Sequence, residues 1–303
     1  MPPVPPLSPT TRSFRAAYDA VLGQWPGPVE AADLPTPYGV TRVNSCGPAD
    51  APPLVLLPGG GATSTVWGAC AAAGLARGHR VHAVDLVGDP GLSVPVPGRP
   101  IRAVGDLVGW LDAVLDALLG GAGGTRQPIT LIGHSYGAWI AAHYAAHHAA
   151  HSAPRQAPRP ARLVLLDPTQ VFAGLRPRYV LRALPMLVRP TPPRIRSFLD
   201  WETRGAALDQ AWLRLQDETA DFPTFRPVTG PRPDLADLAG LARLTELPVH
   251  ILFAERARCH DAARAARAAA AALPGARIDV LPEVSHHALP LTAAQEVARR
   301  LAG

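Results

Sequence analysis

Six short runs of apolar residues, separated by stretches with helical spacing, leave this 303-residue chain few possible folds. Each run is too short for a helix and is apolar on both faces, as in the inner strands of a parallel sheet covered by helices. The stretches between the runs are amphipathic or rich in alanine, as covering helices would be. The alternation predicts an α/β fold with a doubly wound, mostly parallel sheet. The six runs are residues 53–57, 80–85, 129–132, 163–167, 249–253 and 277–281.

Residues 168–245 interrupt this alternation. They contain no clear strand, and they are too many for an ordinary loop. Three helical patterns indicate instead a helical cap, inserted after the strand that ends at Asp167 and placed over the carboxyl edge of the sheet. The patterns lie at residues 181–188, 194–201 and 206–215.

The rest of the chain is predicted to form an N-terminal extension and one core domain. Residues 1–36 make the extension, with a proline-rich start that we expect to be extended or disordered. Apolar residues at spacings of three and four predict a short helix at 13–25. The core combines residues 37–167 with 246–303, so the cap is an insertion within one α/β domain.

Ser135 is the strongest candidate for a nucleophile. It is the centre of Gly133-His134-Ser135-Tyr136-Gly137, a G-x-S-x-G sequence with an apolar run before it and an alanine-rich helical pattern after it. Such a strand–turn–helix presents the serine hydroxyl at the end of the strand, and the flanking glycines let the turn be tight. The pentapeptide alone also occurs by chance, so the prediction depends on its place between a strand and a helix.

A second glycine-rich turn supplies candidate donors for an oxyanion. Pro58-Gly59-Gly60-Gly61 follows an apolar run, and glycines let the backbone come close to a substrate oxygen. We predict that the backbone N–H groups of Gly60 and Tyr136 form the oxyanion hole. A phosphate-binding loop is the alternative, but no Lys-Ser/Thr follows these glycines and the chain contains no lysine.

His286 is the best candidate for the base that activates the serine. It lies in the sequence SHHAL after the last apolar run, the position expected from the chain order Ser, acid, His. Its neighbour His287 is a competing candidate, and His134 is expected to point away from the site. Four further histidines are interpreted as a solvated helix face and not as a metal site, because no carboxylate accompanies them in the usual arrangement. They are His143, His147, His148 and His151.

Taken together, these motifs resemble the α/β-hydrolase superfamily and, more narrowly, its bacterial carboxylesterase-like members that act without a cofactor. The resemblance runs from about residue 37 to the C-terminus and rests on GHSYG, PGGG, AVDLVGD at 83–89 and SHHAL. It implies a Ser-His-acid mechanism with an acyl-enzyme at Ser135 that is then hydrolysed. The dehalogenase and epoxide-hydrolase branches carry Asp at the elbow, so Ser135 argues against them.

The sequence departs from the pattern of this family at two places. The oxyanion loop opens with Pro58-Gly59 where His-Gly is usual, which leaves the backbone donors available. The usual position of the triad acid is occupied by Ala257. A catalytic histidine without an orienting carboxylate loses control of its tautomer and stabilisation of its charged form.

Three carboxylates are candidates to replace that acid. Asp167 ends the strand after the elbow, where other branches of the superfamily keep their acid, and we predict that it orients His286. Asp261 comes next, and Glu255 is the weakest candidate. The alternative role for Asp167 is structural, since Leu-Asp-Pro often closes such a strand as a turn.

Three functions are compatible with these observations. The first is a serine hydrolase that cleaves a small carboxylic ester, thioester or lactone. The second is a cofactor-free perhydrolase that uses the same residues. The third is a catalytically impaired hydrolase-fold protein that binds a ligand, which the alanine at position 257 favours.

Composition argues against other classes of protein. The net charge is +5, but the 29 basic residues are scattered arginines without a dense basic run, so we expect no nucleic-acid partner. Three widely spaced cysteines predict neither a metal site nor a disulfide framework. No apolar stretch is long enough to span a membrane, and the N-terminal residues lack the pattern of a signal peptide. We therefore expect a cytoplasmic protein without a cofactor, with a small-molecule substrate.

Overall fold

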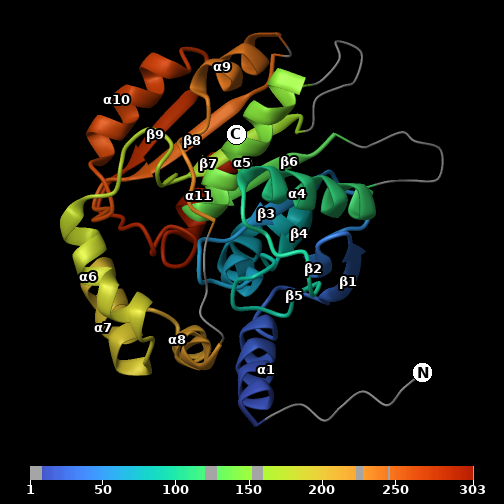
Figure 1. Cartoon of the computed structure of the whole chain (residues 1–303), viewed down its shortest axis with the longest axis vertical. Helices are drawn as coiled ribbons and strands as arrows, with labels where there is room; N and C mark the ends of the chain where they lie inside the picture. The colour runs from blue at the N-terminus through green and yellow to red at the C-terminus, as the bar shows by residue number, and fades with distance from the viewer. Residues whose placement is uncertain (1–8, 120–127, 152–159, 223–227, 245, 303) are drawn as a thin grey trace.

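The computed structural model describes residues 9–119, 128–151, 160–222, 228–244 and 246–302. Within these residues the centre is a nine-stranded sheet in the order β1-β2-β4-β3-β6-β7-β8-β9, with the short β5 paired to β2 (Figure 1). Neighbours from β4 to β9 in this order are parallel, whereas β1–β2 and β2–β4 are antiparallel. The strands are β1 (Glu30–Thr36), β2 (Gly39–Cys46), β3 (Pro53–Leu57), β4 (Arg80–Val84), β5 (Val94–Pro95), β6 (Thr130–His134), β7 (Arg162–Leu166), β8 (Val249–Ala254) and β9 (Arg277–Leu281).

All six apolar runs are parallel strands, which confirms the predicted fold class. β3 and β8 are buried along their whole length, because helices cover the sheet on both sides. The sequence did not predict β1, which is partly exposed, contains Pro35 and forms the edge of the sheet beside β2. An edge strand has one side without a neighbour, so polar residues and proline are tolerated there.

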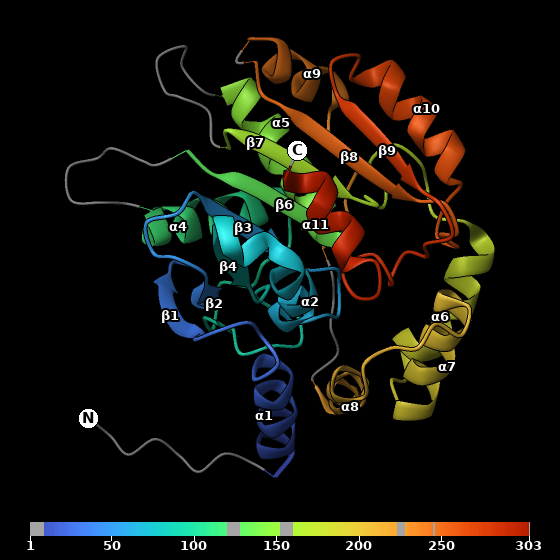
Figure 2. The same cartoon turned by 180° about the vertical axis from the view of Figure 1, so that it is seen from behind.

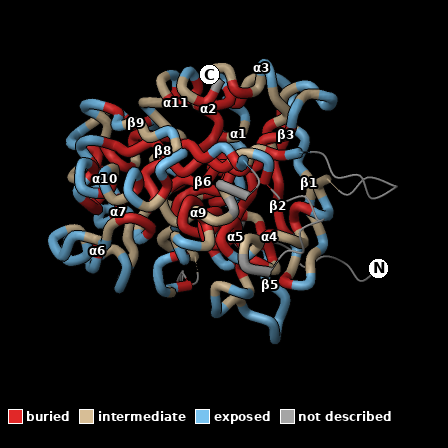
Figure 3. The backbone as a smooth tube through the Cα atoms, turned by 90° about the horizontal axis from the view of Figure 1, so that it is seen from above, coloured by how far each residue is buried: buried red, intermediate tan, exposed pale blue. Residues whose placement is uncertain are grey.

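Helices cover both faces of the sheet, as the two opposite views show (Figures 1 and 2). One buried hydrophobic cluster lies under α4, α5, α9 and α10, and a second lies under α1, α2 and α11. The buried residues gather in the middle of the molecule between these layers (Figure 3). The helices of the two layers are α1 (Pro9–Leu22), α2 (Gly68–Cys70), α3 (Ala76–Gly78), α4 (Val104–Leu119), α5 (Tyr136–His151), α9 (Leu235–Leu244), α10 (Ala262–Ala272) and α11 (Ala294–Ala302).

The segment between β7 and β8 is helical, with α6 (Pro177–Val188), α7 (Pro192–Thr203) and α8 (Gln210–Glu218) before α9. Helices α6 to α8 lie together to one side of the sheet (Figure 1). Helix α9 instead packs against α5 and belongs to a covering layer. The proposed cap segment, residues 168–245, therefore divides into three outer helices and one helix of the sandwich.

Helix α9 also explains why one sequence interpretation is wrong. His143 of α5 is buried, and its Nε2 lies 3.2 Å from the carbonyl oxygen of Pro231, just before α9. It is therefore not on a solvated helix face, because a helix distant in the sequence covers it.

The N-terminal helix α1 is tied to the core and to the outer helices. Tyr18 donates a hydrogen bond of 3.0 Å to the buried Asp85, after β4, and Phe14 packs against Phe222 with ring centroids 4.3 Å apart. The extension, residues 1–36, thus contributes one packed helix and the edge strand β1. The prediction that its proline-rich start is extended or disordered concerns residues 1–8, which lie outside the described residues.

No helix in the described parts of the chain combines the length and the apolar character that crossing a membrane requires.

Candidate active site

Ser135 occupies a strained turn between β6 and α5. Its φ angle is +54°, in the left-handed region that costs energy for any residue except glycine. A Cβ atom at Gly133 would overlap the carbonyl group of Gly137, and one at Gly137 would overlap the carbonyl of Leu57. Both glycines are therefore required by the close approach of strand and helix. The turn has the geometry of a nucleophile elbow.

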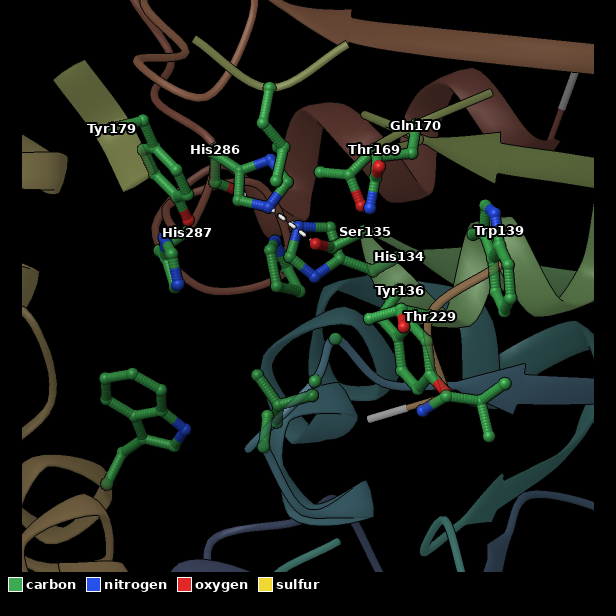
Figure 4. Close-up of a pocket in the computed structure, with 18 residues that line it drawn as sticks. His134, Ser135, Tyr136, Trp139, Thr169, Gln170, Tyr179, Thr229, His286 and His287 are labelled. Carbon is green, nitrogen blue, oxygen red and sulfur yellow. Dashed lines mark hydrogen bonds between the residues drawn. The ribbon is translucent and has the colours of Figure 1, made fainter. Parts of the chain in front are cut away.

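A continuous chain of hydrogen bonds joins Ser135, His286 and Asp167. His286 Nε2 lies 2.7 Å from Ser135 Oγ, and His286 Nδ1 lies 2.6 Å from Asp167 Oδ2 (Figure 4 shows the first contact). Asp167 is fully buried and His286 is 1% exposed. The three residues follow β6, β7 and β9, so the sheet brings the carboxyl ends of separate strands to one place.

The carboxylate of Asp167 has donors on both oxygens. Oδ1 accepts from the backbone N–H of Ala254 and from His260 Nε2, each at 3.0 Å, while Oδ2 faces His286. Burial alone would raise the pKa of Asp167, but His260 and His286 outweigh that effect and hold it well below its usual range. Asp167 is therefore ionised at neutral pH and accepts a proton-bearing Nδ1 from His286.

The other two candidate acids do not contact His286. Asp261 caps α10 by accepting from the N–H of Arg264 at 2.9 Å, and it pairs with Arg176 at 3.1 Å. Glu255 accepts from the N–H of Glu283 at 2.9 Å. Among the candidates in the sequence, the structure brings only Asp167 to the histidine.

His260 was missed by the sequence reasoning. It is 1% exposed, donates to Asp167 and has Nδ1 3.5 Å from Cys259 Sγ. It lies in the loop after β8, which carries the triad acid in most proteins of this fold. Here that loop supplies a hydrogen-bond donor to the acid, and the acid itself follows β7. The proximity of His260 to Asp261 in the sequence was the available signal.

Glu202 of α7 was missed as well. It is fully buried and accepts hydrogen bonds from the backbone N–H of His286 at 3.2 Å and of His287 at 3.0 Å. It also accepts from His287 Nδ1, at 2.9 Å. The competing histidine, His287, thus pairs with a different carboxylate and lies beside the site without contacting Ser135 in the described structure.

The prediction that His134 points away from the site is wrong. Its Nε2 lies 3.0 Å from the carbonyl oxygen of His286, and the two rings are 4.8 Å apart. Burial lowers the pKa of His134 well below its usual value, so the ring is neutral and donates to that carbonyl. A Cβ at Gly59 would come within 3.1 Å of its Nδ1, which accounts for one glycine of the oxyanion loop.

The two candidate oxyanion donors lie beside Ser135. Gly60 and Tyr136 line the same cavity as the serine, and Tyr136 opens α5, where the partial positive charge of the helix N-terminus is located. Asp89 steadies the glycine loop because its Oδ2 accepts from the N–H of Gly61 at 2.9 Å. The arrangement is suited to hold negative charge on an oxygen near Ser135.

The cavity at Ser135 measures about 230 Å³ and adjoins a second cavity of about 140 Å³. The two share residues of their walls, which are Gly60, Ala62, Trp212 and His287. Thr169, Gln170 and Tyr179 are among the residues that contribute polar groups to the wall of the first cavity (Figure 4). The second is mainly apolar and lies between the outer helices, with lining residues that include Met186, Leu187, Ile195, Phe198, Leu199 and Phe222.

Asp167, Cys259 and His286 are the group of potential metal ligands found among the described residues, with ligand atoms within 4.8 Å of one another. The contact of 2.6 Å between Asp167 and His286 leaves no room for an ion between them. All three cysteines of the chain are buried and unpaired.

A model described as the alpha/beta hydrolase family matches residues 54–300, and the chain therefore belongs to that family. Two proteins of Bacillus subtilis (strain 168) are similar in part. Carboxylesterase YbfK is 39% identical over 105 residues, which is 35% of this chain and 34% of the relative. The uncharacterized carboxylesterase nap is 36% identical over 115 residues, or 38% and 37% of the two chains. The chain thus matches about a third of the length of these curated relatives.

Solved structures are similar over nearly the whole chain. The crystal structure of naproxen esterase (carboxylesterase NP) from Bacillus subtilis superposes with a TM-score of 0.79 at 23% identity, covering 99% of this chain and 100% of that one. Carboxylesterase CesB (YbfK) from the same organism gives 0.82 at 24%, covering 97% and 98%. At sequence identities of 23% and 24% this similarity shows the fold alone. It is the fold predicted from the resemblance to carboxylesterase-like hydrolases.

The buried Glu202, paired with the partly buried His287, predicts a pH-dependent contribution to stability. Burial alone would raise the pKa of Glu202, but the charge and hydrogen bonds of His287 hold it at about 2. Because the folded pKa lies below the unfolded one, this contribution is present above about pH 4.5 and is lost as the pH falls towards 2. Glu202→Gln should cost about 3 kcal/mol of unfolding free energy at pH 7, and the cost should shrink over that range.

Urea unfolding of both proteins at pH 7, 4 and 3 measures this difference. Asp200→Asn, at an exposed position of the same helix, is the control and should change stability little at any of these pH values. A cost for Glu202→Gln that does not depend on pH would contradict the assignment of an ionised Glu202 held by His287.

Proposed function

We propose that this protein is a serine hydrolase that cleaves a small carboxylic ester through an acyl-enzyme on Ser135. The observation that carries the proposal is the hydrogen-bonded chain from Ser135 through His286 to Asp167. A serine hydroxyl is a poor nucleophile until a base accepts its proton, and a histidine held by a buried carboxylate is such a base.

Each residue has one role in this reaction. His286 Nε2 accepts the proton as Ser135 Oγ attacks the ester carbonyl carbon, and Asp167 stabilises the imidazolium that forms. The N–H groups of Gly60 and Tyr136 donate to the carbonyl oxygen as it becomes negative. His286 then protonates the leaving alcohol, the acyl group stays on Ser135, and a water deprotonated by His286 releases the acid.

The similar proteins support this reaction but do not indicate the substrate. The relatives that match part of the chain are named carboxylesterases, and an elbow with a Ser-His-acid site is typical of the family. The alternative of an impaired ligand-binding protein depended on Ala257, and the contact between Asp167 and His286 speaks against it. Two adjoining cavities with mostly apolar walls favour an ester with a hydrophobic substituent, and a thioester or lactone belongs to the same chemistry.

The proposal is tested with p-nitrophenyl esters from acetate to decanoate. We expect turnover with a burst of nitrophenol, and a mass increase equal to the acyl group on the peptide that contains Ser135. Folded protein that hydrolyses none of these esters, or an acyl group found on another residue, would overturn the proposal. With hydrogen peroxide added as a second acceptor, the amount of peracid formed from the acyl-enzyme measures perhydrolase activity.

His260 acts as a positioning residue in this scheme, through Asp167. His260→Leu removes a donor to the carboxylate and should lower kcat by about 10- to 100-fold, the equivalent of one hydrogen bond to a charged group. His260→Gln keeps an N–H that can replace Nε2 and should recover most of this loss. The pH profile of kcat/KM separates positioning from folding, since a carboxylate with one donor fewer attracts a proton on His286 more strongly.

The acidic limb of that profile should therefore move to higher pH in His260→Leu and stay near its original place in His260→Gln. Equal losses in both variants, with an unchanged profile, would show that His260 has only a structural role.

A further inference from the structure

Helix α6 carries a row of exposed aliphatic side chains. Val180, Leu181, Leu184, Leu187 and Val188 are between 41% and 73% exposed. Their spacing places them on one side of the helix. They are five of the nine large hydrophobic side chains that are exposed among the described residues. Such a concentration on one helix usually marks a surface that contacts something other than water. We call this row the α6 stripe.

The opposite side of α6 is packed against the rest of the protein. Ala183 is buried, and the ring of Tyr179 lies 5.5 Å from that of Phe198 in α7. The helix is therefore held in place with its stripe facing outward, and Figure 3 shows α6 at the margin of the molecule. The exposure is a property of the folded protein and does not come from a detached helix.

Arginines are the charged residues of α6 and of its C-terminal end. Arg182 lies on the side of the helix away from the α6 stripe. Arg178 and Arg182 are in α6 and Arg189 follows it, whereas the helix contains no acidic residue. Arg182 donates to Ser197, and none of the three forms an ion pair with a carboxylate within the described parts of the chain. A helix with an exposed aliphatic stripe on one side, and with arginines and no acidic residue among its charged side chains, has the character of a helix that lies in the interface of an anionic membrane.

A second copy of the chain fits this surface less well. In a two-fold symmetric contact centred on the α6 stripe, each α6 would face its own copy, which brings the arginines of both chains near one another without carboxylates on the helix to neutralise them. Anionic lipid headgroups neutralise the arginines, while the acyl chains accept the aliphatic side chains.

The stripe also leads to the candidate active site. Leu187 is 51% exposed and lines the apolar cavity as well, beside Met186. That cavity shares Trp212 and His287 with the cavity at Ser135. An aliphatic chain that leaves a lipid layer at Leu187 would therefore enter an apolar cavity that adjoins the one at the serine.

The geometry points to α6 as a docking surface for an anionic lipid layer, from which an ester with an aliphatic chain enters the cavity between the outer helices. The docking is independent of catalysis, whereas the delivery of the ester rests on the function proposed above. The two parts therefore require separate measurements.

Docking is tested by flotation of Ser135→Ala protein with vesicles of phosphatidylcholine alone or mixed with phosphatidylglycerol. We expect binding to the mixed vesicles at least about tenfold tighter than to phosphatidylcholine, and weakened by salt. Leu181→Glu and Val188→Glu should each lower that binding about tenfold or more. Val94→Glu, at a 60% exposed position on β5, is the matched control and should bind as the parent does.

Several results would overturn the docking proposal. They are absence of vesicle binding, equal binding to both lipid compositions, and binding that Leu181→Glu and Val188→Glu leave unchanged. A dimer in analytical ultracentrifugation that these variants abolish, without vesicle binding, would assign the stripe to a second copy and refute docking on lipid.

Delivery is tested with the active protein and its two stripe variants. Hydrolysis of p-nitrophenyl acetate in solution should be the same in all three, whereas hydrolysis of p-nitrophenyl decanoate in mixed vesicles should fall with binding. Equal rates in vesicles would overturn delivery. Loss of activity towards both esters in the unmodified protein would count against the proposed function and leave the docking result standing.

Discussion

Asp167→Asn is expected to lower kcat for an ester about 10⁴-fold, the loss seen when the acid of a serine-protease triad is replaced by its amide. The amide group can donate to Nδ1 of His286, which stabilises the tautomer with its proton on Nε2. In that tautomer the histidine cannot accept the proton of Ser135. KM should change much less than kcat, because the fully buried Asp167 does not line the cavity.

Asp261→Asn is the matched control for this substitution. Asp261 caps α10 and lies at the surface, so its loss should cost about 1 kcal/mol of stability and little activity. Because Asp167 also accepts from the N–H of Ala254, circular dichroism and thermal unfolding must show that both variants are folded. A larger loss of activity in Asp261→Asn than in Asp167→Asn would contradict the assignment of the acid.

Ser135→Ala is expected to lower kcat by about 10⁶-fold, comparable to removing a whole Ser-His-Asp site. The remaining hydrolysis would come from the oxyanion donors and from substrate binding, which do not need the hydroxyl. Stability should be unchanged or slightly higher, although alanine shares the strain of a positive φ at this position. Steady-state kinetics on p-nitrophenyl butyrate, with thermal unfolding of the same samples, measures both effects.

A loss below about a hundredfold in Ser135→Ala would mean that another group carries the reaction. The binding of a non-hydrolysable ester analogue provides the control, since its Kd should stay within a few-fold of the parent protein. A large rise in Kd would show that the substitution disturbs the cavity and not the chemistry.

The parts of the fold that depend on local patterns were predictable from the sequence. The inner strands are apolar on both faces, and this pattern can be recognised within each run of sequence without knowledge of its neighbours in space. The edge strand β1 has no such pattern, because its residues face solvent on one side. The placement of α9 on α5, and with it the burial of His143, depends on contacts between distant segments. The helical patterns of the sequence carry no signal for such contacts.

The candidate site divides in the same way. Ser135 and His286 lie in short motifs whose neighbours define their role. Asp167 was only the favoured candidate among three, since its contact with His286 requires the relative placement of β7 and the loop after β9. Glu202 acts through residues far away in the chain, so nothing in its local sequence indicated a role, and for His260 the proximity to Asp261 was the only signal.

Labelling with a fluorophosphonate probe, followed by peptide mapping, tests the central claim most directly. The probe reacts with a serine only where a base and oxyanion donors activate it. We expect labelling of the native protein at Ser135, none in Ser135→Ala, and labelling slowed by about 10²-fold or more in His286→Ala. Folded native protein that stays unlabelled, or that is labelled at another residue, would contradict the account.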